Sequence, residues 1–156
     1  MYSMLRNKHN FEWTIEQKFC DLKLELSKNN CLYQVDPDAM IFIETDACDT
    51  GFGAILYQMV RGEKRIIEYY SKLFNKPQSA YATVEKEAIA IIFTIKKYKF
   101  LLLGRHFTIK TDHKPLLQYF ENTKNANSRK LWMIFELQEF DYKIEYIEGS
   151  RNTHAD

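Results

Sequence analysis

The spacing of apolar positions predicts three short strands in the first half of the chain. Residues 39–45 (AMIFIET), 52–60 (FGAILYQMV) and 65–71 (RIIEYYS) are dense in β-branched and aromatic side chains. Residues 47–51 (ACDTG) and 61–64 (RGEK) lie between these runs and are typical of tight turns. Because the connections are short, we expect the three strands to form an antiparallel meander.

The apolar period then changes to that of a helix. Between Thr83 and Leu102, apolar residues fall at positions 84, 88, 91, 95, 98 and 102, and Gly104 marks the end of the pattern. A fourth strand is predicted at residues 105–111 (RHFTIKT). A long helix between the third and fourth strands allows them to run parallel, so we expect a mixed sheet.

Three more elements are predicted towards the end of the chain. A short helix should begin near Pro115, and a second helix should span residues 128–140. Residues 141–149 alternate as a half-buried strand does, with Tyr142, Ile144 and Tyr146 on the buried side. The apolar residues assigned to the second helix are Leu131, Ile134, Phe135 and Leu137.

A helical pattern also precedes the strands. It covers residues 11–29, and a linker with a proline follows at residues 31–40. We therefore divide the chain into residues 1–36 and residues 37–156.

Composition indicates the class of protein but does not identify a binding partner. The 156 residues suit one domain with a real core, and 46% of them are hydrophobic, as in globular chains. The net charge of +1 neither demands nor forbids nucleic acid. Three cysteines without metal-ligand spacing argue against a disulfide framework and a structural zinc site, and favour a reducing compartment. No signal-peptide core and no membrane span are predicted.

Two acids follow strand-like runs of the same form. IFIETD ends at Asp46 and FTIKTD ends at Asp112. If the two strands are parallel neighbours, both carboxylates lie at one edge of the sheet, where Mg²⁺ is their natural partner. Each Asp could instead form a turn or cap a helix.

A third acid is needed, and the residue pattern does not select it. Glu85 and Glu87 flank the apolar stripe of the long helix from opposite sides. Asp156 is a fourth candidate, although it could equally be a solvated terminal residue. Asp49 is interpreted as a turn residue. His113 and His154 are interpreted as surface or capping residues.

Taken together, these motifs resemble a known family. TDA…GFGA, Tyr-x-x-x-Glu-x-Glu, TDHKPL and Asn-x-x-Ala-Asp occur in the order and spacing of the ribonuclease H domain of reverse transcriptases from gypsy-class LTR retrotransposons. The resemblance implies an α/β ribonuclease H-like fold with a five-stranded mixed sheet of order 3-2-1-4-5, flanked by helices. It also implies an extra N-terminal helix, and residues 1–36 are then a helical connector from the polymerase side. Residues 37–156 are the ribonuclease H domain.

The resemblance also implies a metal-dependent endonuclease that hydrolyses the RNA strand of RNA–DNA hybrids. It assigns two Mg²⁺ ions, replaceable by Mn²⁺, to the matching acids, and "EAIA" selects Glu87 as the helix acid. These acids are Asp46, Glu87, Asp112 and Asp156. Lys72, Lys114, Arg129 and Lys130 are candidate phosphate contacts, and Tyr81 is a candidate sugar contact. Each could instead be an ordinary surface charge or a core aromatic residue.

The resemblance further implies the polymerase domain of the same polyprotein as a partner, with no small-molecule cofactor and no membrane. The expected location is intracellular, either cytoplasmic in a retroelement particle or nuclear. Two features depart from the pattern of related proteins. Cellular ribonucleases H have a His-bearing loop before the last acid, and this chain lacks it. The family also continues into a helix after that acid, whereas this chain stops at Asp156.

Two other functions would leave different marks in the sequence. An inert connector with the same fold would be marked by lost acids, and all four are present. An integrase or transposase would order its acids Asp, Asp, Glu, whereas here the Glu falls between the two Asp residues.

Overall fold

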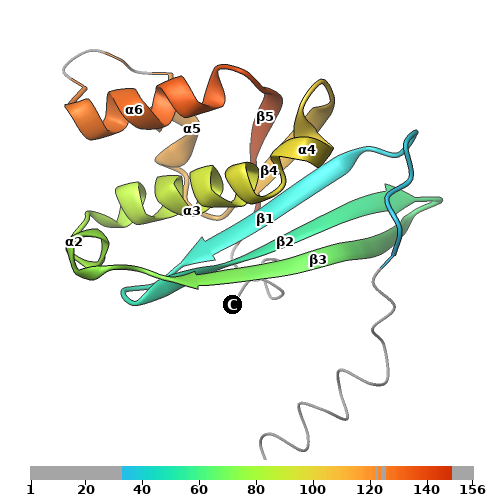
Figure 1. Ribbon diagram of the computed structural model, residues 1–156, viewed down its shortest axis with the longest axis horizontal. Helices are drawn as coiled ribbons and strands as arrows, with labels where there is room; N and C mark the ends of the chain where they lie inside the picture. The colour runs from blue at the N-terminus through green and yellow to red at the C-terminus, as the bar shows by residue number, and fades with distance from the viewer. Residues whose placement is uncertain (1–32, 122, 124–125, 149–156) are drawn as a thin grey trace, which may run out of the picture. The chain divides into compact units, whose positions relative to one another are not determined.

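A single five-stranded sheet organises the part of the chain that is described. The computed structural model describes residues 33–121, 123 and 126–148. The sheet has the order β3-β2-β1-β4-β5 (Figure 1). Its strands are β1 (Ile41–Ala47), β2 (Gly51–Val60), β3 (Glu63–Leu73), β4 (His106–Thr111) and β5 (Asp141–Tyr146). The predicted fold and strand order are confirmed, whereas the predicted N-terminal helix lies outside the described residues.

Strand direction divides the sheet into two halves. β1 with β2, and β2 with β3, are antiparallel, so the predicted meander is confirmed. The turn between β2 and β3 contains Arg61 and Gly62, with φ of 54° and 85°. Two positive φ values suit a hairpin turn because their twist matches that of the strands. β1 with β4, and β4 with β5, are parallel.

The long helical pattern forms two helices rather than one. α3 (Thr83–Lys97) and α4 (Lys99–Leu102) are separated by Tyr98, whose ψ of 17° departs from helical geometry. Tyr98 is buried, and its ring packs edge-on against Tyr70 of β3 at 6.3 Å. Tertiary packing therefore accompanies the break that the periodicity did not predict. The buried stripe itself is confirmed, at Ala88, Ile91, Ile95, Tyr98 and Leu102.

A short helix between β3 and α3 was not predicted. α2 (Lys76–Ser79) begins at Asn75, whose side chain accepts a hydrogen bond from the backbone N–H of Gln78. The side chain of Gln78 accepts one from the Asn75 N–H in return. This reciprocal capping pattern was readable in the sequence Asn-Lys-Pro-Gln.

Helices pack on one face of the sheet, and the core lies between. α3 crosses this face, and α5 (Leu116–Tyr119) and α6 (Ser128–Leu137) lie beyond it (Figure 1). Pro115 is the N-cap of α5, close to its predicted position. The core side chains come from neighbouring strands and from α3, and include Ile41, Ile43, Leu56, Ile91, Phe107 and Ile109.

Of the residues assigned to two apolar faces, Leu137 is buried and Ile134, Tyr142 and Ile144 are half-buried as expected, whereas Leu131, Phe135 and Tyr146 are exposed. α6 buries Met133 and Leu137, while Leu131 and Phe135 are 49% and 71% exposed. Both pairs are four residues apart, so periodicity alone could not tell the packed side from the solvent side. Tyr146 is 38% exposed, because it lies at the very end of β5.

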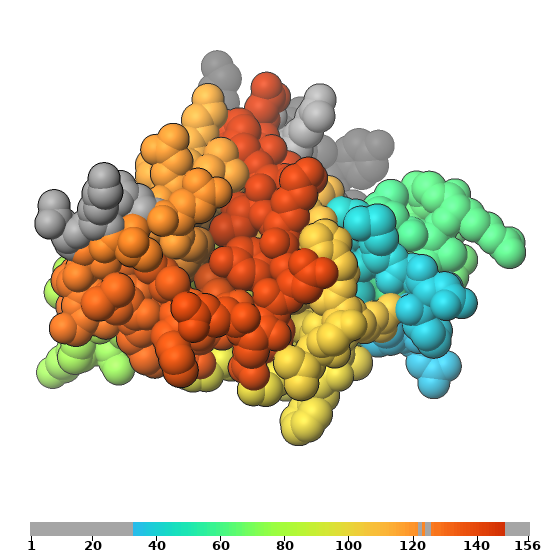
Figure 2. All heavy atoms as spheres, turned by 90° about the horizontal axis from the view of Figure 1, so that it is seen from above, coloured from blue at the N-terminus to red at the C-terminus, as the bar shows by residue number. Residues whose placement is uncertain are grey.

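Ion pairs fasten α6 and the turn after it to the other helices. Lys96 of α3 pairs with Glu136 of α6 at 2.8 Å, and Lys99 of α4 pairs with Glu139, which follows α6, at 2.6 Å. Figure 2 shows this face, with the orange-red residues of α6 beside the yellow residues of α4. In the part of the chain that the structure describes, no helix is long and apolar enough to cross a membrane.

Polar side chains hold the segment that enters β1. Gln58 is 1% exposed, and its amide donates to the carbonyl oxygens of Asp36 and Ala39 at 2.8 and 2.9 Å. Its side-chain oxygen accepts the Asp36 N–H at 2.8 Å. Arg105, which precedes β4, donates to the same two carbonyl oxygens. The start of β1 is therefore anchored to β2 and to the loop before β4.

Candidate metal centre

The two acids that follow matching strands meet at one edge of the sheet. β1 and β4 are parallel neighbours, with Ile43 opposite Ile109. Asp46 lies near the end of β1, and Asp112 directly follows β4. Because parallel strands end at the same edge, both carboxylates reach the same region.

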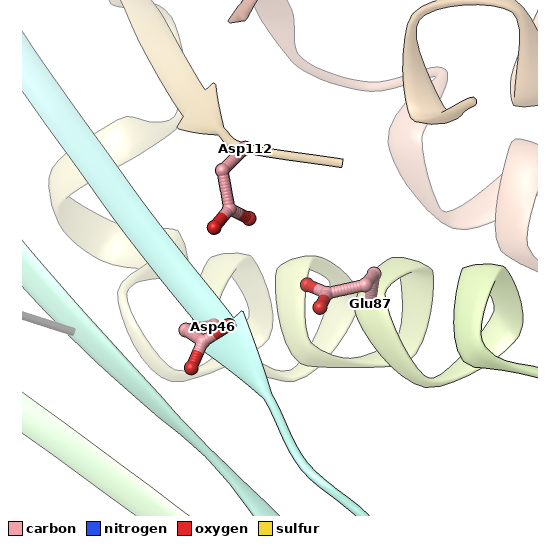
Figure 3. Close-up of side chains that lie close together, drawn as sticks. All are labelled: Asp46, Glu87 and Asp112. Carbon is pink, nitrogen blue, oxygen red and sulfur yellow. The ribbon is translucent and has the colours of Figure 1, made fainter. Parts of the chain in front are cut away.

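Glu87 of α3 completes the cluster. One carboxylate oxygen from each of Asp46, Glu87 and Asp112 lies within 4.8 Å of the others. Figure 3 shows the carboxylates of Glu87 and Asp112 reaching towards the end of β1, where Asp46 lies. Asp46 and Asp112 are half-buried, and Glu87 is buried. Among the described residues, this is the one group of three or more metal-ligating side chains found at such spacing.

The environment of Glu87 disfavours its charged form. Burial, followed by the charge of Asp46, raises the pKa of Glu87 to about 8, and Asp112 adds to the rise. The backbone N–H of Ala47 donates to Oε1 at 3.3 Å and acts in the opposite direction. Within the described part of the chain, Oε2 is buried without a hydrogen-bond partner. A buried, under-satisfied oxygen facing two carboxylates fits a site for a divalent cation with oxygen ligands.

Tertiary contacts separate the two helix acids that periodicity left equivalent. Both oxygens of Glu85 lie 2.8 Å from Arg129 of α6. Oε2 of Glu85 also accepts the N–H of Ala82, which caps the start of α3 at 3.3 Å. Glu85 is therefore engaged by Arg129 and the helix start, and Glu87 faces the two Asp residues.

The predicted substrate contacts lie outside the acidic cluster. The Lys72 ammonium lies 4.2 Å from the ring centroid of Phe93, and the Lys114 ammonium 4.9 Å from that of Tyr146. Tyr81 packs against the guanidinium of Arg129 at 3.7 Å. The other predicted cation, Lys130, lies over the Tyr119 ring at 4.5 Å. Their roles in binding a substrate stay predictions.

An open hollow of about 680 Å³ adjoins Asp46. Its wall is formed by the end of β1, the turn into β2 and the end of β3, and includes Asp46, Cys48, Thr50, Gly53, Ser71 and Lys72. The sequence pattern did not predict this hollow, because it depends on how three strand ends meet. One of the three clustered acids, Asp46, therefore lies in the wall of this hollow.

Four candidate residues from the sequence remain to be placed, namely Asp156, His154, His113 and Asp49. Asp156 and His154 lie outside the described residues. His113 is half-buried just before α5, and its carbonyl oxygen accepts the N–H of Leu116 at 3.0 Å, while Pro115 is the N-cap. Asp49 lies in the turn between β1 and β2 as expected, but it also pairs with Lys86 at 2.7 Å. Lys86 was not singled out from the sequence, where nothing marks it apart from other lysines.

Comparison with known proteins gives the family. Residues 36–140 match the RNase H-like domain found in reverse transcriptase. The chain belongs to this family. It is 36% identical over 148 residues to the retrovirus-related Pol polyprotein from transposon 412 of Drosophila melanogaster, a match that covers 94% of this chain and 12% of that protein. The chain therefore spans only a small part of the length of this curated relative.

Solved structures support the same fold. The foamy viral protease-reverse transcriptase in complex with RNA/DNA hybrid has a TM-score of 0.63 at 18% identity, covering 95% of this chain and 21% of that one. RNase H1 from the archaeon Halobacterium salinarum has a TM-score of 0.53 at 12% identity, covering 76% of this chain and 91% of that one. The family match and the retrotransposon relative confirm the prediction from the sequence motifs, which was an RNase H domain of a retrotransposon Pol polyprotein.

Proposed function

We propose that this chain is a metal-dependent endonuclease that hydrolyses the RNA strand of RNA–DNA hybrids, as part of a retrotransposon reverse transcriptase. The observation that carries the proposal is the convergence of Asp46, Glu87 and Asp112 at one sheet edge. Membership of a nuclease-type family supports it. So does the likeness to a reverse transcriptase solved in complex with RNA/DNA hybrid.

The acids would act as ligands rather than as general bases. Asp46, Glu87 and Asp112, with Asp156 as a fourth ligand, would hold two Mg²⁺ ions, and Mn²⁺ would substitute. Ions bound there supply an activated water and charge stabilisation for the leaving 3′ oxygen. Because the pKa of Glu87 is raised to about 8, Glu87 must release its proton when it becomes a ligand. Metal binding should therefore be stronger at alkaline pH.

Nucleic acid would approach the acidic edge along the open hollow. Lys72 borders that hollow, while Lys114 follows Asp112 by two residues. We assign phosphate contacts to both lysines and a sugar contact to Tyr81. RNA would be distinguished from DNA by its 2′-hydroxyl groups, which face the wide minor groove of the hybrid. The polymerase domain of the same polyprotein would hold the rest of the duplex.

A labelled RNA–DNA hybrid tests the proposal. Cleavage in Mg²⁺ is compared for the wild type, Asp46→Asn and Asp112→Asn, both in this chain and in the full reverse transcriptase. Asp38→Asn, an exposed acid in the segment before β1, is the matched control. We expect the wild type and the control to cut only the RNA strand, and the two site variants to lose at least about 100-fold in rate.

The opposing result is equally clear. If the wild type cuts no hybrid in the full reverse transcriptase, or if the site variants cut as fast as the control, the nuclease proposal fails. An inert connector would then be the better interpretation. Such a connector should also show no Mg²⁺ or Mn²⁺ site that depends on Asp46 or Asp112.

A further inference from the structure

One lysine in α3 is buried although its partner is exposed. The Lys86 side chain is 9% exposed, and its ammonium lies 2.7 Å from Oδ1 of Asp49, whose side chain is 96% exposed. Lysine is among the residues least often buried, because its charge is costly to remove from water. The side chain of Lys86 thus lies along the protein interior and ends at the turn between β1 and β2. This turn directly follows Asp46.

A second contact joins the same turn to α3. The N–H of Ala47 donates to Oε1 of Glu87 at 3.3 Å. Consecutive residues of α3, Lys86 and Glu87, therefore bind residues 49 and 47, which immediately follow the first acid of the cluster. Both contacts cross from the helix layer to the strand end, and in both of them α3 contributes a side chain.

The far side of the turn is fixed to the sheet. The N–H of Cys48 donates to the carbonyl of Gly51 at 2.9 Å, which closes the turn. The N–H of Phe74 donates to the carbonyl of Thr50 at 2.8 Å, which ties it to the end of β3. The turn is consequently held between α3 and β3. Without the α3 side, the turn would be held by this bond to Phe74 and by the pairing of Asp46 with Gly53 and of Ala47 with Phe52.

The acidic cluster depends on how closely the end of β1 approaches α3. One carboxylate oxygen of Asp46 lies within 4.8 Å of one of Glu87. The pair between Lys86 and Asp49 joins the same two elements one residue along the helix, so it limits how far they can move apart.

We propose that Lys86 is a positioning residue, which through its ion pair with Asp49 fixes the turn after β1 against α3 and so sets the spacing of Asp46 and Glu87 for metal binding. This inference rests on the proposed function, since it concerns the same metal centre. It assigns Lys86 no contact with substrate.

Metal titration of the wild type and three variants tests the assignment without an activity assay. Binding of Mn²⁺ and of Mg²⁺ is measured by calorimetry for the wild type, Lys86→Met, Asp49→Asn and the double variant. Groups that orient metal ligands typically change affinity 10- to 100-fold, so each single variant should bind about 10-fold more weakly. The double variant should be no weaker than either single one, because both changes remove one interaction.

Three further measurements exclude other roles. Lys86→Arg keeps the charge and reach, and should restore affinity to within about 3-fold of the wild type. Lys97→Met removes another ion pair of α3, with Glu68 at 3.5 Å, and should leave metal affinity unchanged. In the hybrid assay, Lys86→Met should lower kcat at limiting Mg²⁺ and recover at saturating Mg²⁺, with KM unchanged.

The outcomes separate this inference from the proposed function. If Lys86→Met and Asp49→Asn bind metal as the wild type does, the positioning role is wrong. A raised KM for hybrid in Lys86→Met but not in Asp49→Asn would make Lys86 a phosphate contact and also overturn it. If the wild type itself binds no metal, the proposed function fails first. The Asp49 variant guards against misfolding, because an exposed side chain is altered.

Discussion

The backbone N–H of Ala47 donates a hydrogen bond to the buried carboxylate of Glu87 at 3.3 Å. This contact links the end of β1 to α3 at the residue directly after Asp46. It stabilises the charged form of Glu87, yet burial and Asp46 outweigh it, so the pKa remains raised to about 8. At this acidic cluster the fold therefore tolerates an unfavourable charge environment, which a bound cation would relieve.

The stability of the metal-free protein should fall as pH rises from about 5 to 8. Glu87 binds its proton more tightly in the folded state, where its pKa is about 8 against an ordinary value of 4.5. Its contribution is thus complete below pH 4.5 and is lost as pH rises through 8. Urea unfolding in a chelator should show a loss of about 3 kcal/mol that is absent in Glu87→Gln. Equal pH slopes in the two proteins would contradict the assignment.

Removing one Asp from the cluster should stabilise the metal-free fold. In Asp112→Asn one of the two charges that oppose ionisation of Glu87 is lost. We expect a gain of about 1 kcal/mol at pH 8, and none at pH 4.5, where Glu87 is protonated. Thermal unfolding in a chelator measures it. The same variant should gain no stability from added Mg²⁺, in contrast to the wild type. A variant that is less stable than the wild type at pH 8 would count against repulsion.

Replacing Gly51 should be unfavourable because the site has no room for a side chain, and not because of its backbone conformation. A Cβ at this position would lie 2.6 Å from the carbonyl oxygen of Lys72. Gly51→Ala should therefore move the turn after Asp46, cost about 2 kcal/mol and weaken Mn²⁺ binding. Gly62→Ala is the matched control, since its φ is 85° but nothing lies within 4 Å of the added atom. The control should cost about 1 kcal/mol and leave Mn²⁺ affinity intact. Equal metal affinities in the two variants would show that the turn tolerates the methyl group.

Gln58 should contribute strongly to the free energy of unfolding, although it is a polar residue. Its side chain satisfies three backbone groups in the segment before β1. Gln58→Leu would leave buried donors and acceptors without this partner, so we expect a loss of about 3 kcal/mol in the free energy of unfolding. Gln138→Leu, at an exposed position after α6, should change it by less than about 0.5 kcal/mol. Urea denaturation compares the two. Similar values would mean that Arg105 alone anchors the segment.

Part of the site was predictable, because an acid that directly follows a strand-like apolar run can be recognised in the sequence. The matching runs before Asp46 and Asp112 place both acids at strand ends. That the two strands are parallel neighbours was implied by the family resemblance, and the structure confirms it. The helix ligand was not predictable from spacing. Glu85 and Glu87 differ in their neighbours, Arg129 in one case and two carboxylates in the other, and those neighbours come from distant parts of the chain.

By itself the sequence determined the strands, the long helical stripe and the acids, because residue spacing encodes secondary structure and the family motifs are local. Only the tertiary structure decided where the helix breaks at Tyr98, which side of α6 is buried, and that Lys86 reaches Asp49. Each of these depends on contacts between elements far apart in the chain. The energy of such contacts arises from packing and from charges brought together by folding, which no local pattern of residues records.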